Sequence, residues 1–295
     1  MELCALVKDY LGSSRELYKQ KTYCHYQTLA ETYLSKVVAC SESSPNTFLP
    51  QGLSYSTQKV LKSLINRTLN YAHQNNYLQE KIKVTTKLKQ EPKTKTKTFS
   101  ELDCMRIEDY ILSNHKYYSY DVLISLYSGL RIGELLALKW SDIDFENRLL
   151  TVSATQNDIL EDHKFVSYID TPKTLSSARQ IPISTHLLGI LKDLKSWQGE
   201  RCEKVITGRT GEGVFIRAYQ DSFSRLLKKL NIKHLGFHCL RHTFASRCYH
   251  GGMDIKSLSE ILGHSNTSIT MNIYVHSSME QKLASLDMVN KKIGV

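Results

Sequence analysis

A lysine-rich stretch without an apolar repeat is the feature that most constrains how this chain folds. Between Lys81 and Lys97 the sequence holds seven lysines and one acidic residue, and its last five residues alternate lysine with threonine. We see no apolar periodicity there that could pack, which is typical of a linker. A chain of 295 residues is also long enough for two ordinary domains. The sequence therefore predicts a domain over residues 1–92, a linker over 93–98 and a second domain over 99–295.

The first domain is predicted to be a small helical bundle. Its apolar residues recur at helical spacing, first at Leu3, Leu6, Val7 and Tyr10, then at Tyr26, Leu29, Ala30 and Tyr33, and again from Ser54 to Leu78. A loop rich in serine and proline, around residues 41–52, separates the two halves of this domain.

Positive charge is concentrated at this end of the chain. The whole chain carries a formal net charge of +10, and residues 1–97 hold 15 lysines and arginines against 7 acidic residues, a surplus of 8. Such a balance favours a polyanionic partner. The lysines of the linker, Lys93, Lys95 and Lys97, then have two interpretations: a solvated tether, or a strap over DNA phosphates. Their place beside a basic bundle favours the strap.

The second domain is predicted to be mixed. Ser100 is a helix cap with Asp103 three residues later, and an apolar helical stretch from Val122 to Leu138 is interrupted at Ser128-Gly129. Three short strands follow at residues 149–153, 165–170 and 180–183, the last two joined by a turn that contains Lys173, and helices then continue to the end. The predicted fold class is mainly α with a small antiparallel β-sheet (α+β).

Composition argues against several classes of protein. The seven cysteines form no CxxC pair, so a disulfide framework is not expected. No apolar run approaches the ~18 residues that a membrane span needs. The N-terminus lacks the pattern of a signal peptide, so we expect a cytoplasmic protein with no membrane partner.

Arg131 is the first residue with a chemical signature. It follows Gly129 at the start of an apolar helix, where a guanidinium lies beside free backbone N–H groups and can help to bind an anion. Glu134, one turn later, could hold that arginine in place. By itself the pair could equally be an ordinary ion pair.

A second cationic group lies near position 240. His238 and Arg241 share one helix face, so an imidazole and a guanidinium point the same way. His238 and His242 also have the spacing of a zinc-binding helix, but Cys239 stands where the catalytic glutamate would be, and we set aside a zinc site on these residues. A phosphate pocket fits better.

The last group follows a short helix. Ser257 to Glu260 read as a capping box that starts a helix ending at Gly263, and His264 comes next. Tyr274 lies ten residues beyond His264, but most of the 17 tyrosines must simply pack, so only the whole constellation singles it out.

Together these residues resemble the active-site pattern of tyrosine recombinases of the phage integrase family. The pattern runs Arg131, then His238-x-x-Arg241, then Leu262-Gly263-His264, then Tyr274. The surrounding segments GLRIGELLALKW, HCLRHTFAS and LGHSNTSITMNIY are similar to those of the family. Lys173 in TPKT falls at the position of the family's hairpin lysine. The resemblance spans the chain, weakly before Phe99 and strongly after it.

The resemblance implies a chemistry. A site-specific recombinase of this kind cuts and rejoins DNA through a 3′-phosphotyrosine on Tyr274 and a Holliday junction, with no metal ion, ATP or other cofactor. Arg131 and Arg241 would grip the phosphate and His264 would hydrogen-bond to it. His238 would take the tyrosine proton, and Lys173, with Lys164 as the alternative, would protonate the departing 5′ oxygen.

The resemblance also implies partners. Residues 1–92 would be the core-binding domain on double-stranded DNA carrying specific sites, and four copies would assemble there, with accessory proteins possible. The tail from Glu280 to Val295 could dock into a neighbouring copy or pack on its own domain. The chain is expected to begin at the core-binding helices, which leaves open integration, excision, inversion and resolution.

Two rival functions share parts of this pattern. A type IB topoisomerase would use the same phosphotyrosine chemistry to relax supercoils, and an inactive descendant would be a DNA-binding regulator. The sequence around His238 and His264 resembles recombinases more than topoisomerases. Every expected active-site position is also filled. We therefore favour the recombinase.

Overall fold

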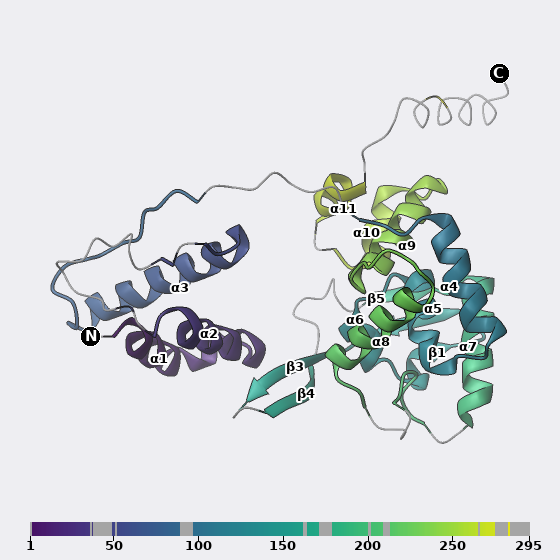
Figure 1. The fold of residues 1–295 in the computed structure, drawn as a ribbon, viewed down its shortest axis with the longest axis horizontal. Coiled ribbons are helices and arrows are strands. Elements are labelled where there is room, and N and C mark those ends of the chain that lie inside the picture. Colours follow the sequence, from purple (N-terminus) through teal and green to yellow (C-terminus); the bar gives the residue numbers. More distant parts are fainter. Residues whose placement is uncertain are drawn as a thin grey trace. The chain divides into compact units, whose positions relative to one another are not determined.

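The protein divides into two units in a computed structural model (Figure 1), which describes residues 2–35, 37, 49–50, 52–88, 97–161, 164–170, 179–199, 202–208, 213–264, 266–274 and 283. One unit is Met1–Thr94 with Asp158–Val166, and the other is Lys95–Asn157 with Ser167–Val295. Lys93, Lys95 and Lys173 lie outside the described residues, as does the tail apart from Leu283. None of the helices in the described part of the chain is long and apolar enough to cross a membrane.

The described part of the first unit holds the helices α1 (Leu3–Ser13), α2 (Gln20–Tyr33) and α3 (Tyr55–Gln74), with a 3-10 turn η1 (Arg15–Leu17) between the first two. The apolar face predicted for α1 is buried, with Leu3 and Val7 fully enclosed, and α1 packs against both α2 and α3. Ser54 begins α3 by accepting a hydrogen bond from the backbone N–H of Thr57 at 3.3 Å. The predicted helical bundle is therefore present.

Part of the lysine-rich stretch packs, which corrects the expectation that it has nothing to bury. Val84 is fully buried against α3. The side chain of Asn66 accepts from the N–H of Val84 at 2.8 Å and donates to its carbonyl at 3.2 Å, and Lys62 donates to the carbonyl of Thr86 at 2.7 Å. The amide of Asn66 thus supplies the donor and acceptor that a neighbouring strand would offer.

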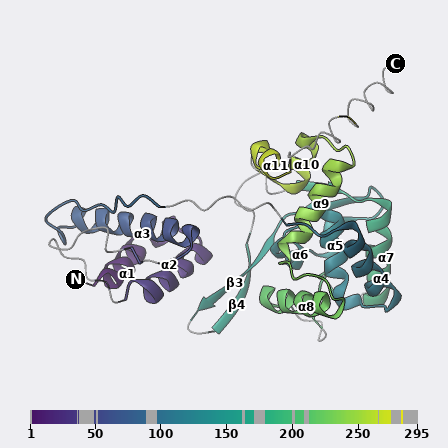
Figure 2. The ribbon, with the colours of Figure 1, turned by 45° about the horizontal axis from the view of Figure 1, so that its top comes forward.

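The second unit is built around α5. Its helices are α4 (Glu101–Ser113), α5 (Tyr120–Ser128), α6 (Ile132–Ala137), α7 (Thr185–Gln198), α8 (Ile216–Lys229), α9 (His238–His250), α10 (Ile255–Leu262) and α11 (Thr267–Tyr274), with 3-10 turns η3 (Tyr117–Ser119) and η4 (Trp140–Asp142). Eight of the nine residues of α5 are buried, and α5 packs against α7 and α9 (Figure 2). A helix enclosed on all sides forms the centre of a core.

The predicted strands are present, but they pair differently from the expectation. An antiparallel sheet has the order β1 (Ile143–Asp144), β2 (Leu149–Val152), β5 (Arg179–Pro182), and a separate pair joins β3 (Thr155–Glu161) to β4 (Lys164–Asp170). The last two predicted strands, β4 and β5, were expected to be neighbours across a turn; instead β5 pairs with β2. The strands β1 and β3 were missed because one has two residues and the other mixes polar and apolar positions without strict alternation.

Asp121, in the first turn of α5, is a buried acid. The residue is 4% exposed, and its Oδ1 has no hydrogen-bond partner among the described residues. Burial raises the pKa of this carboxyl to about 7, although the backbone N–H groups of Asp121 and Val122 partly oppose the shift. The folded protein therefore holds a proton on Asp121 that the unfolded chain releases at much lower pH.

Replacing Asp121 with asparagine is expected to stabilise the protein more at pH 8 than at pH 5. Because the folded pKa is raised, wild-type stability from this group is present at low pH and is lost as pH rises towards 7. The neutral amide avoids the buried charge, so at pH 8 the free energy of unfolding should rise by on the order of 1 to 3 kcal/mol. Urea titrations of both proteins at the two pH values check this, and an equal effect at both would contradict it.

Candidate active site

The turn between α5 and α6 places Arg131. Gly129 ends α5 in the left-handed conformation, with φ +68°, and a Cβ there would lie 2.4 Å from the ring of Phe244. Glycine is therefore required both by the backbone and by the close approach of α9. Arg131 then caps α6, and the carboxylate of Glu134 accepts from its backbone N–H at 2.9 Å and from its Nη1 at 2.7 Å. The structure thus brings together the predicted pair.

Glu134 also binds a second arginine, which the sequence analysis missed. Arg179, the first residue of β5, donates through Nη1 at 3.1 Å and Nη2 at 2.9 Å to the two oxygens of the Glu134 carboxylate. Burial alone would raise the pKa of Glu134, but Arg179 and then Arg131 outweigh it and lower that pKa to about 2. The carboxylate is therefore charged throughout the physiological range. The sequence signal was a lone arginine at the edge of a predicted strand, which is not specific.

Arg241 reaches the same place from α9. The residue is 2% exposed, and its guanidinium donates to the carbonyl of Gly129 at 2.8 Å and to that of Leu262 at 2.6 Å. A buried guanidinium must have such acceptors, since leaving its charge without partners would be costly. The turn at Gly129 and the end of α10 together fix its position.

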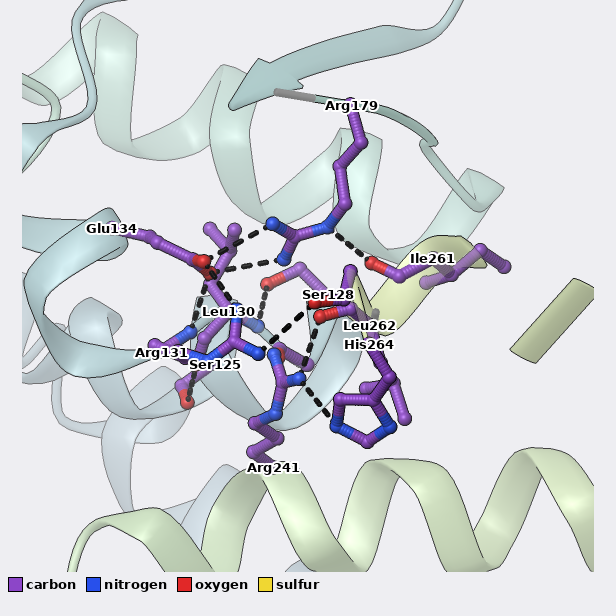
Figure 3. A network of polar contacts seen from close by, with 12 residues as sticks. Ser125, Ser128, Leu130, Arg131, Glu134, Arg179, Arg241, Ile261, Leu262 and His264 are labelled. Carbon is purple, nitrogen blue, oxygen red and sulfur yellow. Dashed lines mark hydrogen bonds and ion pairs between the residues drawn. The ribbon is translucent and has the colours of Figure 1, made fainter. Parts of the chain in front are cut away.

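The C-terminal end of α10 is where the three arginines converge (Figure 3). Its last carbonyls have no helical partner, and three in succession accept an arginine: Ile261 from Nε of Arg179 at 2.5 Å, Leu262 from Arg241, and Gly263 from Nη2 of Arg131 at 3.2 Å. The negative end of a helix favours such cations. Three arginines against the one carboxylate of Glu134 leave a net charge of +2 in this cluster.

The start of α10 differs from the prediction, whereas its end agrees with it. Asp254, not Ser257, is the cap: its Oδ1 accepts from the backbone N–H of Ser257 at 2.9 Å. An aspartate three residues earlier thus competes successfully for the free N–H groups of the first turn. Gly263 ends the helix with φ +63°, as predicted.

His264 has a defined tautomer in this arrangement. Its Nε2 lies 3.0 Å from Nη2 of Arg241 and its Nδ1 lies 2.8 Å from Oγ1 of Thr270. Because arginine only donates, Nε2 must accept and Nδ1 carries the proton, which it donates to Thr270. Burial and then the charges of Arg241, Arg131 and Arg179 lower the pKa of His264 to about 4, so the ring is neutral.

The same charges affect the histidines of α9. The pKa of His238, at the start of the helix, is lowered by partial burial of its ring and then by Arg241 and Arg131. Burial and the neighbouring His238 lower the pKa of His242 to about 4, and the two rings lie 4.5 Å apart. Within the described residues, no group of three or more His, Cys, Asp or Glu side chains could hold a metal ion. The lowered pKa values keep both imidazoles neutral.

The remaining predicted residues are placed in part. Tyr274 is the last residue of α11, one helical turn after the buried Thr270, which receives the hydrogen bond from His264. Lys97, near the N-terminal end of the second unit, is exposed, and Lys173 lies outside the described residues. The arrangement can neutralise an anion and accept a proton beside a helix that carries a tyrosine.

Comparison with known proteins bears on this arrangement. Residues 97–281 match the model of the phage integrase family. The chain belongs to that family. A tyrosine recombinase XerC-like protein of Caldanaerobacter subterraneus subsp. tengcongensis, a relative within this group, is 31% identical over 269 residues, covering 83% of this chain and 68% of the relative.

Other relatives of this phage integrase family member come from mobile elements. The transposase from transposon Tn916 of Enterococcus faecalis is 32% identical over 187 residues, which is 58% of this chain and 45% of the transposase. This chain thus matches less than half the length of that protein. The integrase of transposon Tn1549 in complex with transposon right end DNA shares the fold, with a TM-score of 0.80 at 23% identity over 98% of this chain and 99% of the other.

Proposed function

We propose that this tyrosine recombinase cuts a DNA strand by attack of Tyr274 on a backbone phosphate and rejoins strands through a 3′-phosphotyrosine. The observation that carries the proposal is the convergence of Arg131, Arg179 and Arg241 on one helix end, beside the helix that bears Tyr274. Such a cluster of cations meets the main need of phosphoryl transfer, which is neutralisation and positioning of the phosphate.

The two predicted arginines, Arg131 and Arg241, differ in exposure and therefore act on the phosphate in different ways. The side chain of Arg131 is 38% exposed, so its guanidinium grips a non-bridging oxygen directly. Arg241 is buried in the same cluster and adds its permanent charge there. In the state described, His264 holds Arg241 and offers no proton to a phosphate. A hydrogen bond from His264 to the phosphate therefore needs the other tautomer or a protonated ring.

Proton transfer is assigned to His238 and Lys173. A tyrosine is a weak nucleophile until its proton leaves, and the lowered pKa of His238 keeps that ring neutral and able to accept it. Lys173 then protonates the departing 5′ oxygen, with Lys164, at the start of β4, as the alternative donor. The phosphotyrosine conserves the bond energy, so a 5′ hydroxyl from the partner strand reverses the attack without ATP or a metal ion.

The partner is double-stranded DNA that carries specific sites. The basic residues 1–92 clamp the duplex as a core-binding domain, the catalytic domain follows the linker 93–98, and four copies assemble for two rounds of exchange through a Holliday junction. A lambda integrase tetramer bound to a Holliday junction shares the fold, with a TM-score of 0.66 at 17% identity. The likeness to transposon proteins favours integration or excision of a mobile element. The proposal places this reaction in the cytoplasm, with accessory proteins as possible further partners.

The strap interpretation of the linker predicts a change in salt dependence. Replacing Lys93, Lys95 and Lys97 together with alanine should flatten the plot of log affinity against log salt by roughly 0.9 for each phosphate that is no longer neutralised, up to roughly 2.7. The lysine-to-arginine triple variant keeps the charge and is expected to keep the wild-type slope. Fluorescence anisotropy with labelled duplex measures both, and an unchanged slope in the alanine variant would leave the linker a solvated tether.

A plasmid assay separates the proposed function from its rivals. A supercoiled plasmid that carries two copies of the DNA flanking this gene is incubated with the protein in EDTA and without ATP. We expect recombinant circles from this plasmid and no reaction with a plasmid lacking the sites. Relaxation of both plasmids would indicate a topoisomerase, and tight binding without any strand cleavage would indicate an inactive regulator.

A further inference from the structure

Arg179 has no role in the proposed chemistry, yet it belongs to the arginine cluster at the end of α10. Its side chain is 6% exposed, against 38% for Arg131, the arginine proposed to grip the phosphate directly. Both terminal nitrogens bind Glu134, and Nε binds the carbonyl of Ile261. These bonds direct its guanidinium into the protein, so Arg179 is placed to act on the site through its neighbours.

The first neighbour is Glu134, which joins Arg179 to Arg131. Each oxygen of the Glu134 carboxylate accepts one bond from each arginine: Oε1 from Arg131 Nη1 and Arg179 Nη1, and Oε2 from the Arg131 backbone N–H and Arg179 Nη2. A two-pronged contact of this kind fixes the plane of a carboxylate. The orientation of the exposed Arg131 guanidinium therefore depends on a bond that Arg179 makes.

The second neighbour is the end of α10. Arg179 binds the first of the three carbonyls there, and Arg131 binds the third. Gly263 packs directly on the Arg179 side chain, since a Cβ at position 263 would lie 2.9 Å from Nη1 and 3.0 Å from Cδ. The same arginine thus touches both the carboxylate and the helix end that hold Arg131.

We propose that Arg179 is a positioning residue for DNA cleavage, which orients Arg131 through Glu134 and through the end of α10 without touching the DNA. The inference rests on the proposed function, because Arg131 is the group that meets the phosphate. A misplacement of about 1 Å at a reacting group can lower the rate by roughly 100-fold. A purely structural salt bridge would instead affect stability, whatever residue stands at position 131.

A double-variant cycle distinguishes the two roles. Covalent adduct formation on a nicked duplex is measured in single turnover for the wild type, Arg179→Met, Arg131→Ala and the double variant. We expect Arg179→Met to slow cleavage by roughly 10- to 100-fold with unchanged affinity for the duplex. In the Arg131→Ala background the same change should slow cleavage by less than about 3-fold, because the residue that Arg179 positions is gone. Equal losses in both backgrounds, or no loss in either, would overturn the proposal.

Two further variants control for folding. Arg179→Lys keeps the charge beside Glu134 but cannot form the two-pronged contact, so it should fold and cleave between the wild type and Arg179→Met. Should Arg179→Met fail to fold, the same cycle is run with Arg179→Lys. Arg106→Met removes an exposed arginine of α4, which donates to the carbonyl of Leu230, and should cleave at the wild-type rate in both backgrounds.

A measurement without cleavage keeps this inference separate from the proposed function. In protein labelled with [15N]arginine, the Nε–H signal of Arg131 is assigned by its loss in Arg131→Ala. We expect a slowly rotating guanidinium in the wild type and in Arg106→Met, and fast rotation in Arg179→Lys. An Arg131 signal unchanged by Arg179→Lys would contradict the positioning role. Absence of an adduct in the wild type would instead count against the proposed function alone.

Discussion

Tyr274→Phe is expected to abolish covalent attachment to DNA, with adduct formation lowered by at least roughly 1,000-fold, the scale of loss when a nucleophile is removed. The variant lacks one oxygen, and phosphate contacts elsewhere supply the affinity for the duplex, so binding should change by less than about 2-fold. Single-turnover cleavage of a nicked duplex and anisotropy measure the two quantities on the same DNA.

A matched tyrosine serves as the control. Tyr249, near the end of α9, is half-buried, and Tyr249→Phe removes the same hydroxyl group from a helix of the same unit. This variant should cleave at the wild-type rate. Cleavage by Tyr274→Phe at a rate near that of Tyr249→Phe would exclude Tyr274 as the nucleophile.

Arg241→Lys is the second change with a large expected effect. The guanidinium holds two carbonyls and the ring of His264 at once, and a lysine keeps the charge but cannot reach all three acceptors. Loss of a placed donor at a site of charge development costs roughly 100- to 1,000-fold in rate. We expect a loss of that size in cleavage, with affinity for DNA lowered by less than about 3-fold.

The burial of Arg241 makes a stability control necessary. Acceptors left without a partner each cost about 1 to 3 kcal/mol, so Arg241→Lys should also lower the free energy of unfolding. Cleavage is therefore compared at a temperature where urea titration shows the variant to be folded. A folded variant that cleaves normally would show that Arg241 is not part of the active site. A folded variant that no longer binds DNA would show that Arg241 serves to bind DNA and not to catalyse cleavage.

The parts of the site that the sequence predicts are those built by local signals. The break at Gly129, the pairing of Arg131 with Glu134 and the helix end at Gly263 each depend on residues within one turn. A left-handed glycine, or a charge pair three residues apart, acts in the same way in most surroundings. Short-range patterns therefore carry over to the structure.

The parts that it does not predict depend on contacts between distant segments. Arg179 binds Glu134 across 45 positions, and its own segment indicates only a strand. The pairing of β2 with β5 depends on how the whole unit packs, and the burial of Val84 depends on an amide 18 positions earlier, on Asn66. No periodicity within one element encodes such contacts, since each is decided by which surfaces the fold brings together.

The central claim is that Tyr274 becomes joined to DNA, and mapping the adduct tests it most directly. The protein is incubated in EDTA, without ATP, with nicked duplexes from the DNA flanking its gene, and SDS-resistant adducts are digested with trypsin for mass spectrometry. The tryptic peptide 257–282 contains one tyrosine, Tyr274, so a nucleotide on this peptide locates the bond. We predict this peptide as the site of attachment; a nucleotide on a peptide with any other tyrosine would contradict the account.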